Sequence, residues 1–164
     1  MPARHFERLS PAAIAALTRI VEESSPLDSE GLRDMLQQFV SARMALARRF
    51  LSNAVDNAAS EQPDFRLIVS RAYYAMYHAA RSVVFAFSRA DVDAHRELPS
   101  KLPSDFPDRG LWVERLKGWR IRRDAADYSP FADEDQNALK ADAIADSGAF
   151  YQLCSEYVRK RGDL

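Results

Sequence analysis

The residues best suited to chemistry lie in one short segment, GWRIRRDAADYSP, at residues 118–130. It holds three arginines, two aspartates and a tyrosine, and it ends at a proline, which disfavours helix at the residue before it. A guanidinium binds phosphate or carboxylate through several N–H donors, whereas carboxyl and phenol groups accept or donate protons. The segment therefore predicts either an anion-binding site or a set of ion pairs.

Arg123 differs from the other cations of this segment because it falls on an apolar stripe. At helical spacing it continues the line of Trp112, Leu116 and Trp119. A guanidinium on such a face needs a carboxylate, a carbonyl or a phosphate as partner, and Asp127 lies one turn later. Two interpretations follow, a structural Arg–Asp pair and a phosphate-binding arginine.

Arg120 and Arg122 lie on other sides of the same predicted helix. They are either solvated cations near the negative end of the helix dipole or further contacts for a bound anion. A second polar group lies on the predicted central helix, where one face carries Arg71, Tyr74, His78 and Arg81. This face predicts an anion site if Arg123 lies opposite it, and core packing is the alternative for its tyrosine and histidine.

A periodicity near 3.6 residues predicts an all-α fold. We expect an N-terminal helix over residues 10–24, a second from Asp28 or Ser29 to about residue 50, and a central helix opened by Pro63. Two more are expected, at about 111–128 and 133–161, after an irregular connection with three prolines. Residues 1–29 are interpreted as an extension helix and 30–164 as the bundle.

Composition narrows the function classes. A net charge of −1 gives no overall basic field, so attraction to nucleic acid must come from a local patch. The single cysteine, Cys154, excludes an internal disulfide and has no metal-type spacing around it, so we expect no metal, no cofactor and a cytoplasmic protein. The most apolar window is interrupted by Arg71, His78 and Arg81, which argues against a membrane span.

The segments SRAYYAMYHAA (70–80) and RRDAADY (122–128) resemble motifs of the HEPN domain superfamily, in a small prokaryotic branch with SRAYYAM and RxxADY elements. The resemblance covers roughly residues 30–160. It implies an up-and-down four-helix bundle with an extra N-terminal helix, a homodimer, and a role in a toxin–antitoxin or defence module beside a minimal nucleotidyltransferase. Many members of the superfamily cleave RNA without metal, so it also implies RNA or a nucleotide as ligand.

The active motif of such members has an arginine, a polar residue and a histidine. In this chain the resemblance assigns these positions to Arg123, Asp124 and Tyr128, so a tyrosine replaces the histidine. A phenol with a pKa of about 10 and an ordinary carboxyl such as that of Asp127 are both poor bases at neutral pH. His78 is the histidine that we name as a substitute, with His95 of the proline-rich connection as a further one.

Three interpretations remain. The first is an RNA- or nucleotide-directed component with little or no catalysis, because Tyr128 replaces the histidine. The second is a metal-independent ribonuclease that uses Arg123, and the third is a structural partner subunit that docks another chain through Trp112 and Trp119. The resemblance further implies that Tyr128, if exposed, receives nucleotides from the partner enzyme.

Overall fold

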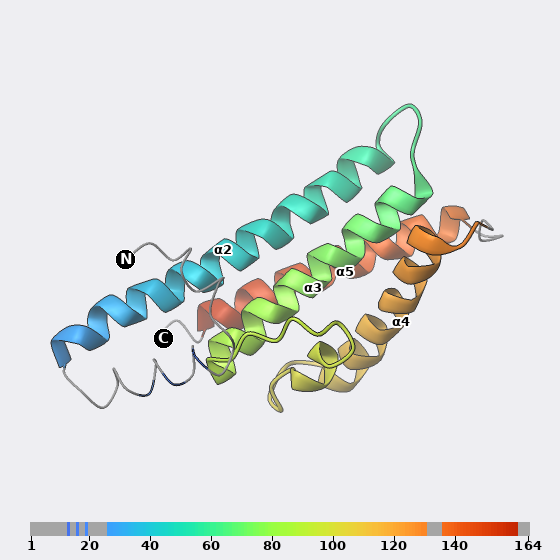
Figure 1. Cartoon of the computed structure of the whole chain (residues 1–164). Coiled ribbons are helices and arrows are strands. Elements are labelled where there is room, and N and C mark those ends of the chain that lie inside the picture. Colours follow the sequence, from blue (N-terminus) through green and yellow to red (C-terminus); the bar gives the residue numbers. More distant parts are fainter. Residues whose placement is uncertain (1–12, 14–15, 17–18, 20–25, 131–135, 161–164) are drawn as a thin grey trace.

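The structure is a computed structural model, and it describes residues 13, 16, 19, 26–130 and 136–160. Within them lie four long helices, α2 (Pro26–Ala58), α3 (Phe65–Ser88), α4 (Arg109–Tyr128) and α5 (Gln136–Lys160), and a short 3-10 helix, η2 (Leu98–Lys101). Successive long helices run in alternating directions (Figure 1). The described part of the chain contains no strand, so the predicted all-α helical bundle is confirmed.

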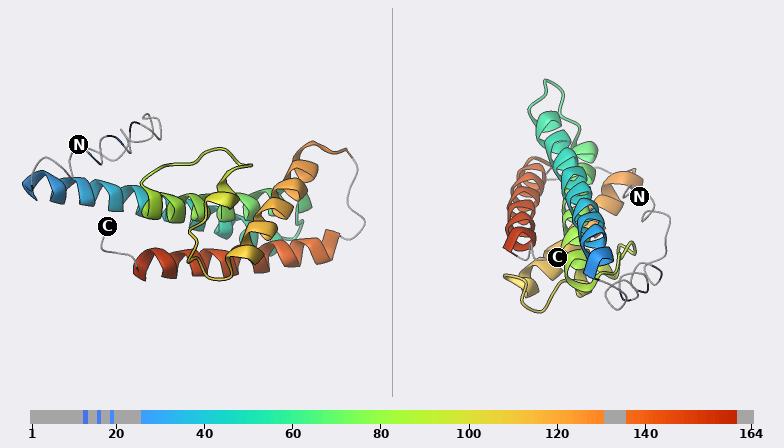
Figure 2. Two further views of the ribbon diagram at one scale, coloured as in Figure 1. Left: turned by 90° about the horizontal axis from the view of Figure 1, so that it is seen from below. Right: turned by 90° about the vertical axis from the view of Figure 1, so that its left-hand side faces the viewer.

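Helix α3 is the centre of the bundle. It packs against α2, α4 and α5, and its buried residues run almost without a break from Ile68 to Ala86. Figure 2 shows α5 running along the bundle and α4 crossing it obliquely. Small side chains at Ala72, Ala79 and Ala80, all fully buried, let the neighbouring helices approach closely. The prediction of a buried central helix is confirmed.

The ends of the helices correct the predicted boundaries. Helix α3 begins at Phe65, after Pro63, because the carboxylate of Asp64 caps it by accepting from the backbone N–H groups of Arg66 and Leu67 at 2.9 and 3.2 Å. The predicted end of α2 near residue 50 is wrong. The helix continues to Ala58, since Ala54 is fully buried against the core and Ser52 donates to Asp56 one turn later.

Helix α2 also starts earlier than predicted. It begins at Pro26, a residue that suits the first turn because it lacks an N–H, so the predicted start at Asp28 or Ser29 is wrong. The boundary proposed between residues 29 and 30 lies within this helix. The helix predicted over residues 10–24 lies almost wholly outside the described residues, and it stays a prediction.

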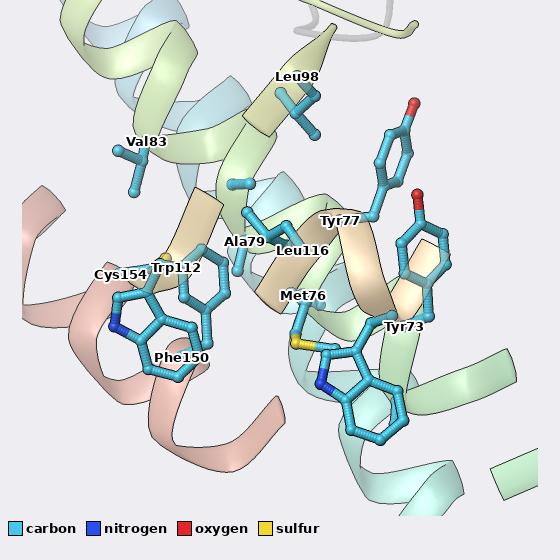
Figure 3. Packing of buried hydrophobic residues seen from close by; sticks show 14 of the residues in the cluster. Tyr73, Met76, Tyr77, Ala79, Val83, Leu98, Trp112, Leu116, Phe150 and Cys154 are labelled. Carbon is cyan, nitrogen blue, oxygen red and sulfur yellow. The ribbon is translucent and has the colours of Figure 1, made fainter. Parts of the chain in front are cut away.

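The apolar stripe of α4 faces the interior. Trp112, Leu116 and Trp119 are 5%, 2% and 1% exposed, and the Trp112 ring packs on Phe150 of α5 with centroids 4.8 Å apart (Figure 3). The indole Nε1 of Trp119 donates to Asp146 of α5 at 2.8 Å. The suggestion that these tryptophans dock another chain is therefore wrong, because they are core residues of this chain.

The connection between α3 and α4 is irregular apart from η2, as predicted, yet it is packed. Leu98, Leu102 and Phe106 are buried in the core, and the hydroxyl of Tyr157 on α5 donates to Asp105 at 2.7 Å. This packing holds the second half of the connection, residues 98–106, against the core. Among the described residues, no helix has both the length and the apolar character that a membrane span requires.

Candidate functional site

The contact between α3 and α4 brings the two predicted polar groups together. Nη2 of Arg123 donates to the hydroxyl of Tyr74 at 2.8 Å. The same guanidinium lies over the rings of Tyr74 and Tyr73, at 5.1 and 5.5 Å from their centroids. Arg123 therefore does lie opposite the polar face of the central helix, as the anion-site interpretation required.

Carboxylates of its own helix also hold Arg123, which is 8% exposed. Nη1 donates to Asp124 at 2.9 Å, and Nε lies 3.5 Å from a carboxylate oxygen of Asp127. Nε is buried without a hydrogen-bond partner, and only two of the five guanidinium N–H groups are used in hydrogen bonds. The predicted Arg–Asp pairing is present, and the guanidinium retains donors for a further anion.

His95 enters this site from the connection. Its Nδ1 lies 2.7 Å from the hydroxyl of Tyr73, and its ring stacks on Tyr77 with centroids 4.0 Å apart and planes 14° apart. Burial lowers the pKa of His95 below its ordinary value of 6.5, and the positive charge of Arg123 lowers it further. The imidazole is therefore neutral at pH 7, the state in which it can accept a proton.

Two buried tyrosines support His95. Figure 3 shows the rings of Tyr73 and Tyr77 side by side, with both hydroxyls pointing the same way, out of the apolar core. The Tyr77 hydroxyl donates to the backbone carbonyl of Asp93 at 2.7 Å, which fixes the connection two residues before His95. Burial raises the pKa of both phenols, so they stay protonated. We call Tyr73, Tyr74, Tyr77, His95 and Arg123 the Tyr–His–Arg cluster.

Arg81, a predicted anion ligand, has another partner. It forms a two-point ion pair with Asp91 of the connection, through Nε at 2.8 Å and through Nη2, and Nη1 donates to Tyr77. Asp91 also binds Arg43 of α2 at 3.2 Å. This network anchors the start of the connection, so Arg81 positions the irregular segment that carries His95.

His78 is buried, and its ring contacts two members of the cluster, Tyr74 and Tyr77, with centroids 6.4 and 5.1 Å away. Its ring stacks on Phe50 of α2, with centroids 5.4 Å apart and planes 10° apart, and Nδ1 is buried with no hydrogen-bond partner. Burial, with added repulsion from Arg43 and Arg81, lowers the pKa of His78 to about 4. A catalytic role for His78 stays a prediction, and the geometry around Arg123 favours His95.

The remaining candidates lie around the rim. Arg120 pairs with Asp124 at 3.1 Å, Arg122 lies over the outer side of Trp119 at 4.8 Å, and Arg71 lies over the Phe50 ring at 5.5 Å. Tyr128 is 78% exposed at the end of α4. Its side chain is accessible, which is the condition set for its modification.

From the sequence we named His95 but could not place it relative to Arg123, and we did not identify Tyr73 as a site residue. The signal was present in the doubled tyrosine of YYAMY, because neighbours on a helix point about 100° apart and so can serve two contacts. Tyr74 contacts Arg123 and Tyr73 contacts His95. No spacing rule links a histidine in a proline-rich connection to either.

The described residues contain no group of three or more metal-ligating side chains that could hold an ion. Comparisons with protein-family models, with curated proteins and with solved structures found no match.

Proposed function

We propose that this protein is an RNA-directed component of a toxin–antitoxin or defence module, and that the Tyr–His–Arg cluster is a metal-independent centre for cleavage of the RNA backbone. One observation carries the proposal. His95, whose imidazole is neutral, is hydrogen-bonded to Tyr73, and Arg123 is hydrogen-bonded to the adjacent Tyr74. In this proposal His95 takes the role of the histidine that α4 lacks. The resemblance to HEPN domains supplies RNA as the substrate class.

Such cleavage needs three groups. A base takes the proton from the 2′-hydroxyl, whose oxygen attacks the neighbouring phosphorus, an acid protonates the leaving 5′-oxygen, and a cation stabilises the negative charge of the phosphorane. His95 is the base that this site offers, and Arg123 is the cation. The products are a 2′,3′-cyclic phosphate and a 5′-hydroxyl, and no metal ion takes part.

The hydrogen bond between Tyr73 and His95 sets the tautomer of the imidazole. If Nδ1–H donates to the phenol, Nε2 is unprotonated and accepts the proton of the 2′-hydroxyl; if the phenol donates to Nδ1, Nε2–H is an acid. The reaction starts from the first form: after Nε2 takes the proton of the 2′-hydroxyl, the imidazolium carries a proton on each nitrogen, and it then gives the Nε2 proton to the leaving 5′-oxygen, which returns the ring to its neutral form. Tyr73 is therefore a positioning residue that lets His95 act first as base and then as acid.

The test is incubation of end-labelled RNA with the purified protein in EDTA, followed by electrophoresis. Wild type should produce fragments ending in cyclic phosphate, and His95→Gln should reduce the rate about 10²- to 10⁴-fold, the usual contribution of general acid–base catalysis. Arg123→Lys keeps the charge but loses the fork of donors, and it should reduce the rate about 10²-fold or more.

The same substitution at His78 is the matched comparison. Loss of cleavage in His78→Gln with full activity in His95→Gln would transfer the role to His78. If wild type binds the RNA but does not cleave it, the protein is an RNA-directed component without catalysis. RNA that neither binds nor breaks would contradict the proposal.

A second candidate is a partner subunit for another chain, a second copy or a minimal nucleotidyltransferase. It is supported by exposed apolar side chains on α4, where Leu111 and Ile121 are 51% and 60% exposed. We infer a homodimer through the Ile121 side of α4, tested by sedimentation of wild type and Ile121→Glu, which should sediment as a monomer.

A further inference from the structure

An open groove lies beside the Tyr–His–Arg cluster, between the start of α3 and the end of α4. It has a volume of about 480 Å³ and is lined by Asp64, Arg66, Leu67, Ser70, Arg71, Ala126, Asp127 and Tyr128. Pockets of roughly 300–1,000 Å³ hold small-molecule ligands. We call it the Arg71 groove, because the charges around it single out that arginine.

Three of the four charged groups in the groove already have partners. Asp64 caps α3, Asp127 lies 3.5 Å from Arg123, and Arg66 donates to the backbone carbonyl of Ala126 at 2.8 Å. Arg71 has no carboxylate partner among the described residues; its guanidinium rests on the Phe50 ring. A partly buried cation held in place by an aromatic ring and lacking a carboxylate is suited to a bound anion.

The other lining side chains fit a nucleotide around that anion. The Ser70 hydroxyl lies one residue before Arg71, and no hydrogen bond ties it to another described residue. Tyr128 lines the groove with its ring 78% exposed, the largest exposed fraction among the bulky apolar side chains described. An exposed aromatic ring beside a cation is the arrangement by which proteins stack a base while they hold its phosphate.

The groove also lies in line with the proposed centre. On α3, Ser70 is four residues, about one turn, before Tyr74, and on α4 Asp127 is four residues after Arg123. One helical turn is about 5.4 Å, which is between one and two steps of a stacked strand at about 3.4 Å each. A strand with one phosphate at Arg123 would therefore bring a neighbouring nucleotide to the Arg71 groove.

We propose that the Arg71 groove is the binding subsite for the nucleotide next to the reacting phosphate, with its phosphate on Arg71 and Ser70 and its base stacked on Tyr128. This inference rests on the proposed function, since it needs a single RNA strand at Arg123. Single-stranded RNA would then bind continuously along the contact between α3 and α4, from Arg123 to the Arg71 groove.

The test measures binding of a fluorescein-labelled 12-nucleotide 2′-O-methyl RNA, which lacks the attacking hydroxyl, by anisotropy over a series of salt concentrations. Arg71→Ala should weaken binding and reduce the slope of log K against log salt by about 0.7, the value for one phosphate contact on a single strand. Arg48→Ala is the matched control. It removes one exposed arginine from α2, two residues or about 200° around the helix from Phe50, and should leave the slope unchanged.

Tyr128 is tested by two substitutions. Tyr128→Ala should weaken binding by about 5- to 150-fold, the range that corresponds to losing one stacked base, whereas Tyr128→Phe keeps the ring and should bind within about 2-fold of wild type. Adenosine monophosphate is added as a competitor. Displacement of the RNA at equal phosphate concentration would show a site for free nucleotides and overturn the strand subsite.

The results distinguish failure of the Arg71 groove subsite from failure of the proposed function. If wild type binds the RNA and Arg123→Lys weakens it, but Arg71→Ala and Tyr128→Ala match Arg48→Ala, the subsite is refuted and the proposed function stands. If wild type does not bind at all, both fail. Circular dichroism of each variant checks that the helical fold is retained.

Discussion

The Tyr73 hydroxyl lies 2.7 Å from Nδ1 of His95, although the two residues are 22 positions apart and belong to different elements. The helix supplies a rigid phenol, and the connection supplies an imidazole that stacks on Tyr77. The orientation of the imidazole is therefore set by side chains of the most deeply buried helix. This relationship leads to the first two predictions.

Tyr73→Phe should slow RNA cleavage, because the phenyl ring keeps the packing but leaves Nδ1 of His95 without its partner. We expect at least about a 10-fold fall in kcat, in the range of general acid–base effects, with KM little changed because no substrate contact is removed. Stability should fall by only about 0.5–1.5 kcal/mol, the value of one hydrogen bond. Initial rates and urea unfolding check the two parts, and an unchanged kcat would remove Tyr73 from the mechanism.

The pH dependence of cleavage should follow His95. Burial and the charge of Arg123 lower the pKa of His95 below 6.5, so the neutral base is present at pH 7 and is lost only as the pH falls through this lowered value. The rate should therefore be level on the acid side down to about pH 6.5 and fall below it. Rate measurements from pH 4.5 to 8 test this. A rate that already falls between pH 8 and 7 would identify a base with a higher pKa.

Much of the fold was predictable because helices carry a local signal. The stripe of Trp112, Leu116 and Trp119, read at a spacing of three and four residues, is buried as expected for one face of a bundle helix. Boundaries failed where a local pattern and tertiary packing disagreed. The segment after Phe50 is polar in composition, yet it stays helical because Ala54 packs on the core.

The site was only half predictable. The contact of Arg123 with Tyr74 follows from two helical faces that must meet, and each face could be read from its own spacing. The place of His95 depends on the path of an irregular connection, which is fixed by long-range contacts such as Arg81 with Asp91 and Tyr77 with Asp93. No periodicity encodes those contacts, so His78, which lies on a helix, was the easier histidine to place.

The ion pair of Arg81 and Asp91 should be a large contributor to stability. Arg81 is buried, and Asp91→Ala would leave its charge without a carboxylate, which typically costs about 3–5 kcal/mol. Asp93→Ala is the matched control, because the carbonyl of Asp93 is what Tyr77 uses, and it should cost less than about 0.5 kcal/mol. Urea unfolding measures both. Equal small losses would show that water compensates the Arg81 charge.

Cys154 should be unreactive in the folded protein. It is fully buried, and burial raises the pKa of its thiol well above the ordinary value, so almost no thiolate is present or accessible at pH 7.5. A thiol reagent such as Ellman's reagent should label it only as the bundle unfolds, at a rate that rises with added urea. Rapid labelling in the absence of urea would show that α5 opens locally at this position.

The last prediction concerns His78, whose pKa is lowered to about 4 in the folded protein by burial. The unfolded chain, with a pKa near 6.5, binds the proton more readily, so stability is fully present above about pH 6.5 and is lost as the pH falls toward 4. Allowing for partial solvent screening, this loss should be about 1–3 kcal/mol between pH 7 and pH 4.

His78→Phe keeps a flat ring against Phe50 but cannot be protonated, so its stability should fall less over the same pH range. The difference between wild type and variant isolates His78 from other groups that titrate there, such as His95. Urea unfolding at pH 7 and pH 4 provides the comparison. Parallel losses in the two proteins would show that the His78 ring reaches water or a partner when it is charged, and that its burial does not control acid stability.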